Sequence, residues 1–441
     1  MRFIPSLSAV QDIDDNRRER ALFFAAVACD LLLLAIQLIL CLRFSGEQIS
    51  DARSYLSLAA YCAQNGTWYP SVNDTFATYL FGNGYVNLLA LLMRVKDSIV
   101  WVYALNIAFT QIIVLTSAGI AYRLTGRRTS AYLTVCLLSL MGGFWGEAPI
   151  ARTELCFIAL AGLNLFAMMR RSGAALFFAG AMLALANWVR PLLVVYLPAS
   201  MLYLLLTRTR MRRILAYLAG AALVIALIGT STQRRFGDFV YQAQTMGINM
   251  LMGANDDADG GYVAEVYEEG KPGYIPEGSG VNYAQKDALF KQRAIEWMKA
   301  HPARFLSLIP SKLFYVLATD TYGGSAFFNN ERETDNLAYL LELKDILLFR
   351  GERGLEAGDL VVLLSQAMYM LVFLLYLCSI VSSLLRGIAL DSLHLHLIFA
   401  LACGVTILTV GGARYHMPYI PIFCIFAAQQ LDRMTQKRLR A

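Results

Sequence analysis

Long apolar blocks constrain the fold of this chain more than any other feature. Blocks of roughly 17 to 25 residues recur, and each is about long enough to cross the ~30 Å hydrocarbon core as a helix. Of the 441 residues, 57% are hydrophobic and 16% are charged, which is more apolar surface than one soluble core can bury. We therefore predict an all-α polytopic membrane protein with about ten transmembrane helices. The predicted spans are 21–42, 99–122, 130–145, 154–169, 174–189, 192–207, 214–230, 359–385, 393–411 and 416–431.

Basic residues between the spans predict the orientation, because Lys and Arg are retained on the cytoplasmic side. They precede the first span and follow every second one, which places both termini in the cytoplasm of a plasma (inner) membrane. The formal net charge of +6 then needs no nucleic acid to explain it, and we exclude that partner. The orienting residues are Arg17, Arg18, Arg20, Arg123, Arg127, Arg128, Arg170, Arg171, Arg208, Arg210, Arg212, Arg213, Arg386, Arg433, Lys437, Arg438 and Arg440.

The spacing of the spans divides the chain into three parts. Residues 1–230 form an N-terminal transmembrane module, which includes a long first external loop at 43–98. Residues 231–358 form an extracytoplasmic loop domain, and 359–441 contain the last spans and a basic cytoplasmic tail. External amphipathic or polar helices are expected at 51–64, 85–95, 283–300 and 302–317.

Charged side chains also gather at the predicted external ends of the spans, where the positive-inside rule does not require them. Many cations with a few carboxylates suit a substrate that has an anionic head and an apolar tail. The alternative is that each charge is an interfacial anchor, as charges near helix ends usually are. Arg190 and Arg414 fit that alternative less well. Pro191 breaks the helix beside Arg190 in an otherwise apolar run. The residues are Asp51, Arg53, Lys96, Glu147, Arg152, Glu154, Arg190, Lys312, Arg414 and His416.

Two residues near the first span have predicted local roles. Ser50 is expected to be the N-cap of the 51–64 helix, which places Asp51 in its first turn. Asp30 lies within the first span, and we expect a structural hydrogen bond to another buried polar group, such as Asn164 or Asn187, in preference to a proton relay.

Metal-ligand patterns are weak in this sequence. Residues 255–261 resemble a calcium-binding loop, but Val266 stands where the closing acidic residue belongs. The four histidines form no ligand cluster. We predict no metal site and no required cofactor, with a divalent metal left open as an alternative.

Five stretches occur in one order and on one predicted side of the membrane. They are Ile49–Tyr55, Phe81–Ala90, Pro149–Leu155, Val189–Leu192 and Gly412–Pro421. Together they resemble the GT-C glycosyltransferases, and within them the bacterial enzymes related to protein O-mannosyltransferases and to the lipid A aminoarabinose transferase. The second stretch departs from the family's usual Pro-Gly-Tyr-Pro sequence, because both prolines are missing.

The resemblance implies a GT-C-like bundle and an inverting transferase. The enzyme would move a sugar from a polyprenyl-phosphate donor to a hydroxyl of a lipid, glycan or protein acceptor, surrounded by membrane lipids. Asp51 would be the general base, and Glu154 would support it or orient the acceptor. Donor phosphate contacts would come from Arg190, Lys312, Arg414, His416 and Lys96, and substrate contacts from Arg53, Tyr55, Glu147, Arg152 and Tyr415. Two alternatives remain: a flippase or transporter of a lipid-linked sugar, and a cell-surface glycan polymerase or ligase.

Overall fold

The computed structural model describes residues 7–71, 80–276, 279–281, 283–332, 334, 337–351 and 353–440. Within these ranges the chain is all-α and has no strand, as predicted. A helix lies at each of the ten predicted spans. These helices are α1 (Leu7–Arg43), α4 (Val100–Thr125), α5 (Arg128–Ser139), α7 (Glu154–Met168), α8 (Gly173–Val189), α9 (Leu193–Leu206), α10 (Met211–Phe236), α16 (Ala357–Arg386), α17 (Leu390–Leu408) and α18 (Ile420–Arg440).

Five helices in the described residues, α1, α4, α10, α16 and α17, are long and apolar enough to cross a membrane. Helices α7, α8 and α9 are apolar but shorter. The prediction of an unbroken span at 130–145 is wrong, because α5 ends at Ser139 and a short helix, α6 (Gly142–Gly146), follows it. The Trp145 indole N–H donates to the Ser139 carbonyl over 2.8 Å, which stabilises this turn.

Helix α8 lies between α7 and α10 in the bundle, and its contact with α10 depends on glycine. A Cβ atom at Gly180 would collide with the carbonyl oxygen of Tyr217, and one at Gly220 with that of Phe177. Small residues allow such close backbone approach, which favours helix association where lipid supplies no hydrophobic driving force.

Polar groups inside the bundle pair with one another. Gln111 donates to Asp30 over 3.3 Å, so the predicted partners of Asp30 are wrong. Asn164 donates to the Ala179 carbonyl instead. Asp432 of α18 is buried and accepts from Arg18 and Arg127, which ties α18 to α1 and to the α4–α5 turn.

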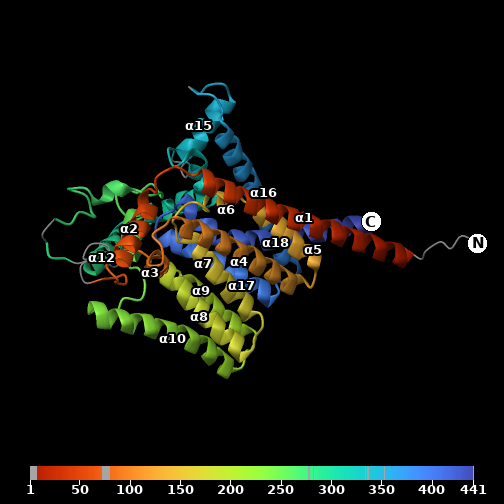
Figure 1. Cartoon of the computed structure of the whole chain (residues 1–441), viewed down its shortest axis with the longest axis horizontal. Coiled ribbons are helices and arrows are strands. Elements are labelled where there is room, and N and C mark those ends of the chain that lie inside the picture. The colour runs from red at the N-terminus through yellow and green to blue at the C-terminus, as the bar shows by residue number, and fades with distance from the viewer. Residues whose placement is uncertain are drawn as a thin grey trace, which may run out of the picture.

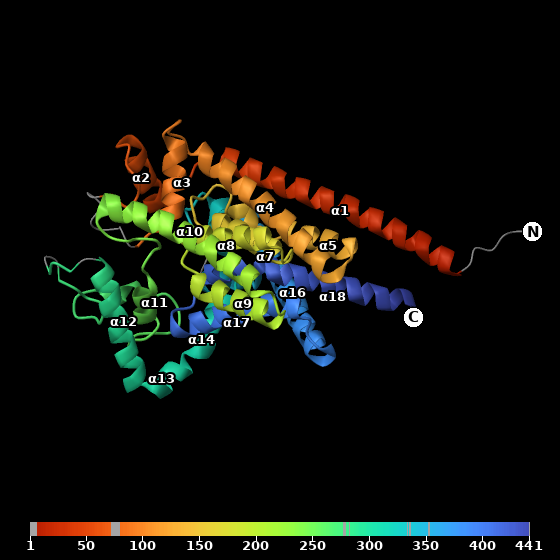
Figure 2. The same cartoon turned by 90° about the horizontal axis from the view of Figure 1, so that it is seen from below.

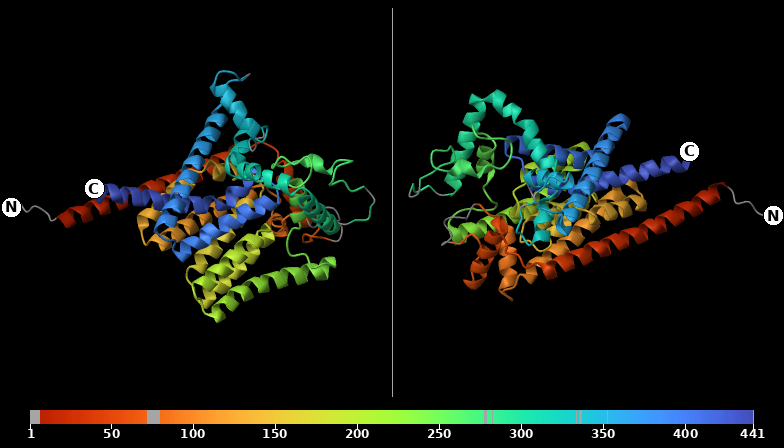
Figure 3. Two further views of the ribbon diagram at one scale, coloured as in Figure 1. Left: turned by 180° about the vertical axis from the view of Figure 1, so that it is seen from behind. Right: turned by 90° about the horizontal axis from the view of Figure 1, so that it is seen from above.

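Both chain termini lie at one end of the molecule, and most of the connecting helices lie at the other (Figure 1). The view from below shows α11–α14 as an arch beside that second end (Figure 2). The views from behind and above show the same separation (Figure 3). The connecting helices are α2 (Ser50–Gln64), α3 (Asn83–Met93), α11 (Met246–Met252), η1 (Ala264–Tyr267), α12 (Tyr283–Ala300), α13 (Pro302–Ser307), α14 (Ile309–Leu317), η2 (Tyr322–Phe328), α15 (Leu337–Leu347) and η3 (Ala413–Tyr419).

The predicted connecting helices are confirmed with local corrections. Helix α12 has the predicted bounds. The predicted helix at 302–317 is divided into α13 and α14, because Pro310 has no N–H to continue the helical hydrogen bonds. Ser50 is the first residue of α2, with φ +53°, and Ile49 is the N-cap, so the predicted Ser50 cap is wrong.

The long segment between α10 and α16 contributes to two small hydrophobic clusters. Phe290 and Ala294 of α12 pack against Leu251 of α11, and Val410 joins them from beyond α17. Tyr339 and Leu343 of α15 pack against α16 in the second cluster. The first cluster covers a cavity at the end of the bundle.

Candidate functional site

A cavity of about 1530 Å³ lies between the end of the bundle and the α11–α12 cluster. Its wall combines α2, the turn before α7, the α8–α9 turn, α17 and η3. Among the described residues its charged lining has five basic and three acidic side chains, namely Arg152, Arg190, Lys286, Lys291, Arg414, Asp51, Glu154 and Asp287. The predicted substrate residues Tyr55 and Tyr415 also line it.

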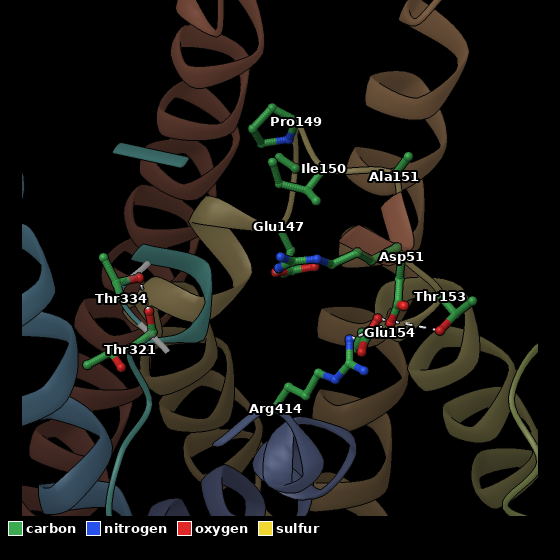
Figure 4. Close-up of polar contacts among 12 residues, drawn as sticks. Asp51, Glu147, Pro149, Ile150, Ala151, Thr153, Glu154, Thr321, Thr334 and Arg414 are labelled. Carbon is green, nitrogen blue, oxygen red and sulfur yellow. Dashed lines mark hydrogen bonds and ion pairs between the residues drawn. The ribbon is translucent and has the colours of Figure 1, made fainter. Parts of the chain in front are cut away.

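Acid–arginine ion pairs dominate the mouth of the cavity. Each predicted carboxylate of the site accepts a hydrogen bond from a different arginine. Arg414 extends from η3 toward Asp51 and Glu154, while Glu147 lies to one side of this group, left of Asp51 in the view (Figure 4). The pairs are Asp51–Arg414 at 2.8 Å, Glu154–Arg190 at 2.5 Å and Glu147–Arg152 at 2.9 Å.

Two side-chain amides fix the acidic turn between α6 and α7. Neither residue was predicted to belong to the site. Asn106 of α4 donates to the carbonyls of Glu147, Ala148 and Ile150. Gln48 donates to the Pro149 carbonyl and accepts from the Ala151 N–H. These bonds satisfy the backbone of an irregular turn beside the bundle, and they determine where Glu147 and Glu154 point.

The Arg190 turn is fixed from both sides. Asn187 accepts from the Leu193 N–H over 2.7 Å and so satisfies an unpaired donor at the start of α9. Gly82 lies against this turn, and a Cβ atom there would collide with the carbonyl oxygen of Val189. The glycine stretch before α3 therefore lets the chain approach the backbone next to Arg190.

An apolar slot continues from the charged mouth into the bundle. It runs between α9 and α17, which pack against each other. Its lining includes Val194, Leu197, Pro198, Phe399, Ala402, Cys403 and Val405. One cavity thus presents guanidinium groups at one end and hydrocarbon side chains at the other.

Burial perturbs Glu147 most clearly among the acids of the turn. Its side chain is 1% exposed. Burial, opposed by Arg152 and reinforced by Glu154, raises the pKa of Glu147 to about 7. Burial thus favours the protonated form of Glu147. The Arg152 guanidinium also lies over the Tyr322 ring, 4.2 Å from its centroid.

Five predicted site residues do not line the cavity. Arg53 is exposed and pairs with Glu47, and Lys96 is exposed in the α3–α4 connection. Lys312 is fully buried, and its ammonium donates to the Ile407 carbonyl in the last turn of α17. Burial lowers the pKa of Lys312 to about 8. The remaining two residues that do not line the cavity are Glu147, which is buried behind the cavity wall, and His416.

His416 lies in a second buried polar group below η3. Its Nδ1 is 2.7 Å from the Val316 carbonyl oxygen, and its Nε2 is 3.3 Å from Asp320 Oδ1. Asp320 itself was not predicted, because nothing in its neighbourhood marks it as close to η3. These contacts hold η3 and give His416 a structural position beneath Arg414.

The cavity also has members that no sequence signal identified. Lys286 and Lys291 of α12 line it, and Asp287 of the same helix lies between them in sequence and also lines it. Tyr262 and Asn249 join them. Only the packing of α11 and α12 over the mouth brings these side chains to the site.

No group of three or more His, Cys, Asp or Glu residues with metal-binding geometry occurs in the described part of the chain. In the 255–261 loop, for which no metal was predicted, the Asn255 and Asp259 side chains accept from the N–H groups of Asp257 and Gly261. No family model matches the chain, and no curated protein matches it significantly.

Proposed function

We propose that this chain is a membrane glycosyltransferase that moves a sugar from a polyprenyl-phosphate donor to a hydroxyl group at the extracytoplasmic face. One observation carries the proposal: a single cavity joins two guanidiniums, Arg190 and Arg414, to an apolar slot between α9 and α17. Arginine suits a phosphate because its planar fork donates two hydrogen bonds at once. The slot suits a hydrocarbon tail. The acceptor is a lipid, a glycan or a protein.

Asp51 is the residue best placed to act as general base. It lines the cavity in the first turn of α2, where the helix dipole favours a carboxylate. The acceptor oxygen forms a bond to the anomeric carbon, and the bond from that carbon to the phosphate oxygen breaks. The leaving phosphate keeps the electron pair, and Asp51 takes the hydroxyl proton. Attack opposite the leaving group inverts the anomeric centre.

The remaining wall residues support this step. Arg414 and Arg190 stabilise the charge that builds on the departing phosphate. Glu154 is buried against Arg190, so it orients that guanidinium. Both chain termini face the cytoplasm of the plasma membrane in this arrangement, and the cavity opens on the opposite side.

Transfer by purified protein tests the proposal. The protein is incubated with a panel of radiolabelled polyprenyl-phosphate sugars and extracted membrane lipids, and products are separated from the donor. Labelled acceptor supports a transferase. Movement of intact donor between the leaflets of proteoliposomes, without transfer, would identify a flippase instead.

Native cysteines supply a binding test that needs no turnover. Cys403 lies in the cavity wall, whereas Cys378 is exposed on α16, away from the cavity. Polyprenyl phosphate should protect Cys403 from alkylation by N-ethylmaleimide and leave Cys378 unprotected, as measured by mass spectrometry of each peptide. Equal modification of Cys403 with and without the lipid would contradict the proposed slot.

A further inference from the structure

The three ion pairs of the site differ sharply in burial. Two are enclosed by protein, and one is open to the cavity on both partners. The exposed fractions of acid and arginine are 2% and 18% for Glu154–Arg190, 1% and 10% for Glu147–Arg152, and 40% and 33% for Asp51–Arg414.

Burial decides which of these pairs a ligand can exchange. An ion pair open to solvent contributes little net stability, since water competes for both charges. Breaking a buried pair leaves an uncompensated charge in a low-dielectric site, which is strongly unfavourable. Glu154 and Arg190 therefore stay together, while Asp51 and Arg414 separate readily when another anion competes for the guanidinium.

The Arg414 side chain has neighbours in the site besides Asp51. The Tyr415 ring lies beside both guanidiniums. Its centroid is 5.9 Å from the Cζ atom of Arg414 and 6.0 Å from the Cζ atom of Arg190. The contacts of His416 with Val316 and Asp320 hold the η3 backbone. The long Arg414 side chain can thus turn from Asp51 toward Arg190 without movement of the backbone.

We propose that Arg414 is an ion-pair switch, in which the donor phosphate displaces the Asp51 carboxylate from Arg414 and so frees Asp51 to accept the proton of the acceptor. This inference rests on the proposed function. Arg414 exchanges one anionic partner for another, so its charge stays compensated throughout. The base becomes available only when the phosphate is in place, which couples proton removal to the presence of the donor.

The switch makes a prediction about binding that is independent of catalysis. Asp51 and the phosphate compete for one guanidinium, so Asp51→Asn should bind polyprenyl monophosphate more tightly than the wild type does. The gain expected from a solvent-exposed pair is about fivefold in Kd. Glu47→Gln is the matched control, because Glu47 forms an exposed pair with Arg53 outside the cavity and should leave Kd unchanged.

A double-mutant cycle separates the switch from a general charge effect. Kd for polyprenyl monophosphate, with no sugar and no acceptor present, is measured for the wild type, Asp51→Asn, Arg414→Gln and the double variant. The switch predicts that Asp51→Asn tightens binding only when Arg414 is present. An equal gain in the Arg414→Gln background would indicate through-space repulsion and overturn the switch.

Other outcomes are also decisive. Equal Kd values for the wild type and Asp51→Asn would overturn the switch and leave the proposed function intact. Failure of every variant and the wild type to bind the lipid would overturn the proposed function itself. Asp51→Ser, which also removes the charge, repeats the measurement if Asp51→Asn unfolds at a lower temperature than the wild type.

Discussion

Three carboxylates within one wall have different chemistry because their surroundings differ. Asp51 faces the cavity, Glu154 is buried against Arg190, and Glu147 is buried behind the lining. Only Asp51 is both exposed to the cavity and placed at the positive end of a helix dipole. In the proposed mechanism Asp51 is therefore the base, and Glu154 and Glu147 are positioning groups that share its charge.

Replacing Asp51 by Asn should abolish chemistry and spare the fold. The amide keeps the shape of the side chain but accepts no proton, so transfer should fall by about 10²- to 10⁴-fold, the usual contribution of a general base. Rates under donor saturation and thermal unfolding are measured together. Near-normal transfer with a slightly lower Tm would mark Asp51 as a helix-start charge worth about 0.3–1 kcal/mol.

Replacing Arg190 or Arg414 by Lys should weaken turnover although the charge is kept. An ammonium lacks the planar fork that contacts two phosphate oxygens at once. We expect each variant to lose at least about tenfold in kcat/KM, equivalent to about 1.4 kcal/mol. Arg53→Lys is the control, since Arg53 lies outside the cavity lining. Wild-type kinetics in both cavity variants would show that the arginines are interfacial anchors.

The raised pKa of Glu147 predicts that the free energy of unfolding depends on pH. Its folded pKa of about 7 lies above its ordinary value of 4.5, so folding favours the neutral acid. The free energy of unfolding should fall as the pH rises from about 4.5 to about 7 and should level off above that. Glu147→Gln keeps an acceptor for Arg152 but does not ionise, so its Tm in detergent should lack this component. An unchanged pH profile in the variant would assign the dependence elsewhere.

At the scale of elements, the packing of the helices depends on close approach of their backbones as much as on the length of their apolar segments. Helices α8 and α10 touch through Gly180 and Gly220, and Gly82 does the same against the Arg190 turn. The apolar pattern predicts that these helices exist, but the pattern is the same on every side of α8. Glycine positions, read in the structure, show which side faces its neighbour.

Gly180→Ala should destabilise the bundle despite the better helix propensity of alanine. The propensity gain is about 1 kcal/mol, whereas overpacking costs about 1–3 kcal/mol, and here the obstacle is backbone that cannot rotate away. Gly404→Ala is the matched control, since nothing lies within 4 Å of a Cβ atom there. Thermal unfolding should show a lower Tm for the first and an equal or higher Tm for the second. The reverse order would contradict the close contact of α8 and α10.

At the scale of the whole molecule, the two ends carry different chemistry. Helices α1 and α18 extend toward one end of the molecule, and α2, α3 and α12 lie at the other (Figure 1). Asp432 of α18 pairs with Arg18 and Arg127, whereas residues of α2 and α12 line the cavity. The proposed function requires the cavity end to lie outside the cytoplasm. This arrangement makes orientation a testable property.

Single cysteines report the orientation. Asn65→Cys and Glu269→Cys lie in the segments predicted to be external, and Met211→Cys lies at the start of α10; all three positions are exposed. An impermeant thiol reagent applied to intact cells should label the first two and leave the third unlabelled, with the wild type as background. Labelling of Met211→Cys from outside would overturn the topology and the assignment of the site to the extracytoplasmic face.

The sequence by itself determined the helical class, the positions of the apolar helices and the charged candidates of the site. Hydrophobic length and loop charge are local properties, and lipid imposes them segment by segment. Which charges meet is a long-range property, because Asp51 and Arg414 are 363 residues apart in the chain and are brought together only by the fold. For the same reason Lys312 and His416 were placed at the mouth by sequence order but lie buried beside α17 and α14. Tertiary structure alone decided which arginine each acid contacts and how deeply each pair is buried, because burial depends on neighbours that are distant in the chain.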